Sequence, residues 1–115
     1  MKVAIGVTDY DLKKISTEDM LEKSEGIIDV EDAVVGCLER FDYVISINKD
    51  YGTQAKQQTF WHETVHAMLD EIGEAALCEN EDFVDAFAKQ IYGFIRRNKI
   101  DKIYAYLGEG NERAN

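Results

Sequence analysis

The stretch His62-Glu63-Thr64-Val65-His66 holds both histidines of the chain, four residues apart. On a helix of about 3.6 residues per turn, this spacing places the two imidazoles on one face, one turn apart. Two neutral imidazoles so placed can bind one Zn²⁺, and Glu63 can reach a water molecule on that metal. The spacing therefore predicts a helix that carries two metal ligands and a carboxylate suited to act as a general base.

Two helices are predicted around and after this stretch. The first runs from about 54 to 72 and ends at Gly73, and the second runs from about 81 to 97 with Asn80 as its N-cap. Apolar residues at helical spacing predict the buried stripe of the first helix: Trp61, Val65, Met68, Leu69 and Ile72. The same spacing predicts the stripe of the second: Val84, Phe87, Ala88, Ile91, Phe94 and Ile95. We expect these stripes, together with Phe83, to form core rather than a substrate pocket.

The N-terminal half predicts a small sheet. Residues 3–8 are apolar and partly β-branched and indicate a strand, with a turn near Asp9. Residues 34–38 and 43–47 can pair as a hairpin across the polar turn 39–42, and 103–107 fits either a last strand or a helical turn. A short helix, capped by Ser16 or Thr17, should run to about Ser24 and stop at Gly26. The expected fold is α+β, with two helices packed against a small sheet.

Length and composition limit the classes of protein to consider. A chain of 115 residues predicts one domain, 1–115, with a flexible tail over about 108–115. The net charge of −10 argues against nucleic acid and against anionic membrane surfaces as partners. No apolar run approaches the ~20 residues of a membrane span, and Cys37 and Cys78 are expected to be free thiols. We therefore expect a cytoplasmic protein.

A catalytic zinc site needs a third protein ligand. Glu81 and Asp85 lie one helical turn apart on one face of the second predicted helix. In that arrangement Glu81 can bind the metal, while Asp85 accepts a hydrogen bond from a ligand histidine and fixes its tautomer. Acidic residues in a first turn also complement the helix dipole without any metal. The rival third ligands are Glu74, Glu79, Asp82 and Cys78.

These residues carry a resemblance to a known group of proteins. Residues 59–68 resemble the extended HExxH pattern of the zincins, and Glu81 with Asp85 resembles the glutamate-then-aspartate helix of the gluzincins. The chain most resembles the short zincin-like proteins of phages and mobile elements, which are related to the ImmA/IrrE metallopeptidases. This resemblance covers roughly residues 34–98 and implies a zincin-like fold. Many gluzincins also have a histidine or tyrosine that stabilises the oxyanion; here Tyr92, Tyr104 and Tyr106 are candidates, and the sequence selects none of them.

The expected function is that of a zinc-dependent metallopeptidase acting on a peptide or protein substrate. His62, His66 and Glu81 would bind Zn²⁺, and Glu63 would take a proton from the metal-bound water and pass it to the leaving amine. The alternative is a zinc-stabilised regulatory or protein-binding module without turnover. The oligomeric state stays open, because a partner or self-association can complete a site on so small a domain.

Overall fold

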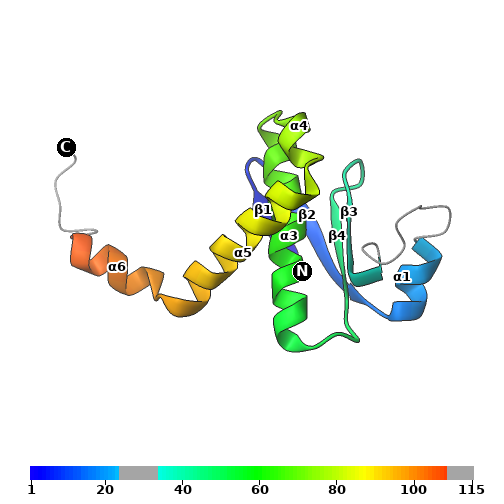
Figure 1. The fold of residues 1–115 in the computed structure, drawn as a ribbon, viewed down its shortest axis with the longest axis horizontal. Coiled ribbons are helices and arrows are strands. Elements are labelled where there is room, and N and C mark those ends of the chain that lie inside the picture. The colour runs from blue at the N-terminus through cyan, green and yellow to red at the C-terminus, as the bar shows by residue number, and fades with distance from the viewer. Residues whose placement is uncertain (24–33, 109–115) are drawn as a thin grey trace.

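A four-stranded mixed sheet forms one layer of the protein, and helices pack against it in an α+β arrangement. The computed structural model describes residues 1–23 and 34–108. The strand order is β1-β2-β4-β3, with β1 (Lys2–Ile5) and β3 (Gly36–Glu39) antiparallel to their neighbours β2 (Thr8–Ile15) and β4 (Val44–Asn48). The two central strands, β2 and β4, are parallel to each other. Helix α3 (Thr53–Glu71) lies against the sheet (Figure 1).

The first hairpin turns earlier than the sequence predicted. Its turn lies at Gly6, whose φ of 59° favours glycine, and Val7, while Asp9 pairs with Ala4 inside β2. The predicted turn near Asp9 was therefore wrong. Asp9 is exposed and the neighbouring Tyr10 is buried, as expected for opposite faces of a strand.

The remaining N-terminal elements agree with the sequence in type, with shifted bounds. Helix α1 (Thr17–Lys23) starts where Ser16 Oγ accepts a 3.1 Å hydrogen bond from the backbone N–H of Asp19, as the predicted cap requires. Its predicted end at Ser24 and Gly26 lies outside the described residues. The β3–β4 hairpin is confirmed, although residues 34–35 are helical rather than extended.

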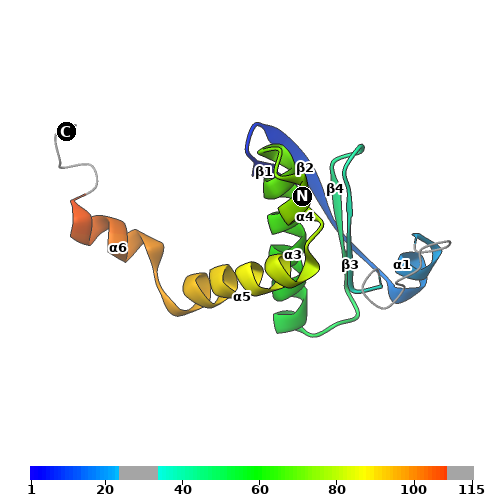
Figure 2. The same ribbon diagram turned by 45° about the horizontal axis from the view of Figure 1, so that its top comes forward.

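Among the described residues, three helices follow α3: α4 (Ala75–Cys78), α5 (Glu81–Arg97) and α6 (Ile100–Leu107). The bounds of α5 are those predicted, and the side chain of its N-cap Asn80 accepts a 3.1 Å hydrogen bond from the N–H of Phe83. Segment 103–107, for which the sequence allowed two readings, is helical. Figures 1 and 2 show α5 crossing α3 and carrying α6 away from the sheet. No helix in the described ranges is both long and apolar enough to cross a membrane.

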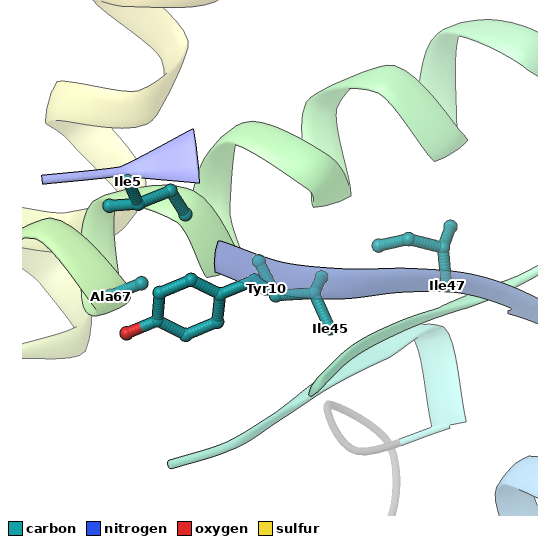
Figure 3. Packing of buried hydrophobic residues seen from close by; sticks show 5 residues of the cluster. All are labelled: Ile5, Tyr10, Ile45, Ile47 and Ala67. Carbon is teal, nitrogen blue, oxygen red and sulfur yellow. The ribbon is translucent and has the colours of Figure 1, made fainter. Parts of the chain in front are cut away.

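The core has two parts that meet at α3. Between α3 and the sheet, the buried cluster comprises Ile5, Tyr10, Ile45, Ile47 and Ala67 (Figure 3). Between α3, α4 and α5, the second cluster comprises Val65, Leu69, Cys78, Val84 and Ala88. Since α3 is covered on two sides, its buried surface is wider than one stripe. The buried residues of α3 all lie between positions 63 and 69.

Both predicted stripes were partly wrong. Met68 on α3 and Ile72 at its C-cap are 41% and 69% exposed. On α5, Val84 and Ala88 are buried, and the small Ala88 lies in the cluster between the helices, as the sequence suggested. Three large apolar residues of α5, beside Ala88 or beyond it along the helix, are exposed: Phe87, Phe94 and Ile95. Toward its C-terminal end α5 runs beyond the sheet, and the chain covers these three side chains only in part (Figure 2).

Candidate metal centre

Two helices bring the predicted ligands together. His62 and His66 lie one turn apart on α3, with ring centroids 5.0 Å apart. Glu81 is the first residue of α5, whose start is fixed by the Asn80 cap and by the packing of Val84 against α3. The first turn of α5 therefore lies over the two imidazoles, although 19 residues separate Glu81 from His62 in the sequence.

The Glu81 carboxylate lies between the two rings. Its Oε2 is 3.0 Å from Nε2 of His62, and its Oε1 is 3.0 Å from Nε2 of His66. The three ligand atoms lie within 4.8 Å of one another, and no other such group of at least three His, Cys, Asp or Glu side chains occurs in the described ranges. Ligand atoms around a tetrahedral Zn²⁺ with bonds of about 2.0–2.2 Å are about 3.3–3.5 Å apart. The group thus forms a candidate metal site, and small movements suffice to close it.

The second ring nitrogen of His62 faces another acidic side chain. Asp85 Oδ1 lies 3.6 Å from Nδ1 of His62, and Asp85 Oδ2 forms a 2.8 Å ion pair with Lys89. The Lys89 ammonium holds the pKa of Asp85 below its usual value. A charged carboxylate at this distance favours a proton on Nδ1 and leaves Nε2 free to bind a metal.

A buried thiol faces the second ring nitrogen of His66. Cys78 Sγ lies 3.7 Å from Nδ1 of His66 and 3.3 Å from the His66 carbonyl oxygen, which accepts its S–H. Arg40 Nη2 donates a 3.0 Å hydrogen bond to the same sulfur. Burial raises the pKa of Cys78, with Arg40 opposing, so the thiol stays protonated. Cys78, a rival ligand in the sequence, therefore lies at Nδ1 rather than at the nitrogen that faces Glu81.

The electrostatics of His66 suit a neutral ligand. Burial lowers the pKa of His66, although the negative charge of Glu81 acts in the opposite direction. A neutral imidazole is the form that binds a metal ion. In the tautomer that donates Nδ1–H to the sulfur, Nε2 of His66 is an acceptor that faces Oε1 of Glu81 at 3.0 Å, and a cation between them would bind to both.

Glu63 lies on the same helix and is buried beside the edge strand β3. A Cβ added to Gly36 would overlap Thr59 Cγ2 and come within 3.5 Å of Glu63 Cγ, so the glycine permits the close approach of β3 to α3. The negative charge of Glu63 also contributes to the raised pKa of the Cys37 thiol on β3, for which burial is the main cause. No local pattern of residues pointed to Gly36 or to Arg40, because both contacts join distant segments.

The other candidates lie outside the cluster of three ligands. Glu74, Glu79 and Asp82 are exposed and are not part of it. The Tyr92 hydroxyl donates a 2.9 Å hydrogen bond to Gln57 Oε1, between α5 and α3. Tyr104 and Tyr106 belong to α6, which the ribbon places at the end remote from the sheet (Figure 1). None of the three tyrosines is distinguished as an oxyanion-binding group.

Comparison of the chain with protein-family models, with curated proteins and with solved structures gave no match. The assignment of a function therefore rests on the geometry of the site.

Proposed function

We propose that the protein is a zinc-dependent metallopeptidase of the zincin type, related to the short ImmA/IrrE-like proteins of phages and mobile elements. One observation carries the proposal: both Nε2 atoms face one carboxylate at 3.0 Å, while each Nδ1 has its own outer partner, Asp85 or Cys78. Histidines that bind a catalytic metal commonly have such a partner on the second nitrogen.

In the proposal, His62, His66 and Glu81 hold the metal and leave one position for water. This donor set of two imidazoles and a carboxylate is typical of catalytic zinc. Bound zinc would supply an acidic water and polarise the substrate carbonyl. The outer partners keep the imidazoles in the tautomer that binds metal, and Lys89 keeps Asp85 charged.

Glu63 is the proposed general base. It follows His62 directly and is buried at the side of α3 that faces β3, so its carboxylate is partly shielded from bulk water. Such a carboxylate can accept a proton from the attacking water and return it to the leaving amine. The role needs Glu63 to contact the water rather than the metal.

The position of β3 supports a peptide as the substrate. β3 is the edge strand of the sheet among the described residues, and its Gly36 approaches Glu63. An extended peptide can add to a sheet edge through main-chain hydrogen bonds. A substrate bound in that way would run past the proposed base.

The experiment compares the zinc-loaded wild type with Glu63→Gln, using unfolded casein as substrate and mass spectrometry to detect new termini. We expect cleavage by the wild type, loss of cleavage in Glu63→Gln with zinc and fold retained, and unchanged cleavage in Glu71→Gln, a control on the same helix. Cleavage that persists in Glu63→Gln, with contaminating proteases excluded, would overturn the mechanism.

A second candidate is a zinc-stabilised module without turnover. It is favoured by the attachment of α5, which packs on α3 and α4 and carries Glu81 at its first position, so that a metal would also join α5 to α3. In this case Glu63→Gln leaves every function intact, and loss of His62 or His66 lowers thermal stability.

A further inference from the structure

The second half of α5 together with α6, residues 90–107, forms an arm that projects from the rest of the protein (Figures 1 and 2). The radius of gyration is 16.2 Å, whereas a compact chain of this length has one of about 13 Å. Helix α6 has no buried residue. Helix α6 therefore gains little from packing against its own chain, whereas Tyr92 on α5 is buried and donates to Gln57 on α3.

Helix α6 is too short to be stable without packing. It has eight residues, and isolated helices shorter than about 12–15 residues are marginal in water. Ile100, Ile103, Tyr104 and Leu107 fall on one face of the helix, and Tyr106 lies off that face. A helix of this kind requires a surface that covers its apolar face.

The angle between α5 and α6 contains a hollow of about 950 Å³. Its apolar lining includes Phe87, Ile91, Phe94, Ile100 and Tyr104. The hollow and the apolar ridge of α6 belong to the same pair of helices. A surface with both shapes can pair with a second copy of itself around a two-fold axis, since each copy then fills the hollow of the other.

The exposed apolar area is sufficient for such a pair. Five large apolar side chains along α5 and on the apolar face of α6 are 42–65% exposed: Phe87, Phe94, Ile95, Tyr104 and Leu107. With about 150–250 Å² for a fully exposed aromatic side chain, their exposed parts total roughly 500 Å² per chain. Two copies would bury about 1,000 Å², the least that a specific interface needs.

Charge disfavours contact between two bodies more than contact between two arms. The chain has a net charge of −10, so most of its surfaces repel a second copy. Residues 96–107 differ, with Arg96, Arg97, Lys99 and Lys102 against the single acidic Asp101. Their smaller net charge repels a second copy less, and pairing through the arms keeps the acidic bodies apart.

We propose that the α5–α6 arm is a homodimerisation surface, in which α6 of each copy occupies the α5–α6 hollow of the other. The pairing does not depend on the metal centre, because none of the three ligands lies on the arm.

Sedimentation equilibrium of the full chain, with and without zinc, tests this proposal over about two decades of concentration. We expect the wild type to reach twice the 13.1 kDa of one chain and no more. Phe94→Glu and Tyr104→Glu should each raise the dimer dissociation constant about 30-fold or more, as for a residue central to an interface. Phe41→Glu is the control, because Phe41 is 98% exposed in the turn after β3, away from the arm.

Circular dichroism checks that each variant keeps its fold, and Tyr104→Glu decides the result if Phe94→Glu unfolds. A wild type that stays monomeric would overturn the proposal; α6 would then pack on its own chain or on another protein. Masses that grow beyond the dimer, or arm variants that dimerise like the wild type, would overturn it as well. Each of these results leaves the proposed metal chemistry unaffected.

Discussion

The sulfur of Cys78 lies 3.7 Å from Nδ1 of His66, inside the cluster that joins α3 to α5. The thiol donates to the His66 carbonyl and accepts from Arg40, so its orientation is fixed from two sides. Cys78 is the partner of Nδ1 in His66, as Asp85 is the partner of Nδ1 in His62. Metal sites commonly use a carboxylate, a carbonyl or a water for this purpose, and here a neutral thiol held by an arginine stands in that position.

Cys78→Ala should weaken zinc binding by about 10–100-fold, the usual effect of losing an outer partner of a ligand histidine. Cys78→Ser keeps a group that can accept from Nδ1 and should lose less. Competition with a chromogenic chelator measures both affinities. Cys37→Ala is the control, since Cys37 has no contact with a ligand histidine among the interactions described. Equal losses in Cys78→Ala and Cys78→Ser would assign the effect to packing alone.

The third ligand can be identified by comparing four isosteric variants. Glu81→Gln should weaken zinc binding far more than Glu79→Gln or Asp82→Asn, because only Glu81 lies 3.0 Å from both imidazoles. Asp85→Asn should have an intermediate effect of about 10–100-fold through His62. Titration calorimetry gives the four affinities under one set of conditions. Similar losses in all four would mean that general acidity, rather than ligation, attracts the metal.

Gly36→Ala should destabilise the protein by about 1–3 kcal/mol, as overpacking does. The new methyl group would overlap Thr59 Cγ2, and the Thr59 hydroxyl donates a 2.8 Å hydrogen bond to the Ala55 carbonyl. Urea unfolding of the metal-free protein measures the change.

Gly93→Ala provides the matched control for Gly36→Ala. Gly93 lies within α5 with no atom within 4 Å of an added Cβ, so alanine there should stabilise the helix by about 0.5–1 kcal/mol. Unchanged stability in Gly36→Ala would show that β3 can move away from α3 at no cost, and the position of Glu63 would then not depend on this contact.

The sequence predicted the parts of the site that depend on local spacing. The four-residue separation of the histidines and the Asn80 cap that starts α5 are both local patterns, and both helices begin and end within one residue of the predicted bounds. Glu81 could be named because a first-turn position on α5 follows directly from that cap. The distance from Glu81 to the imidazoles could not be predicted, because it depends on how α5 crosses α3.

The remaining features required the tertiary structure. Strand β2 carries Asp9, Asp11 and two lysines, so its exposed face obscured the alternation that buries Tyr10. Helical periodicity identified Phe94 as part of an apolar face, but it does not reveal whether the chain covers that face. Arg40 and Cys78 are 38 residues apart, and no local pattern predicts their contact.

The most direct test of the account is a crystal structure of the zinc-loaded protein with anomalous data collected at the zinc absorption edge. The account predicts one zinc per chain, within about 2.0–2.2 Å of Nε2 of His62, Nε2 of His66 and a carboxylate oxygen of Glu81. Water should complete the coordination. A site closed by a fourth protein ligand would contradict the catalytic role, and zinc bound elsewhere, or bound equally by a His62→Ala/His66→Ala variant, would contradict the site itself.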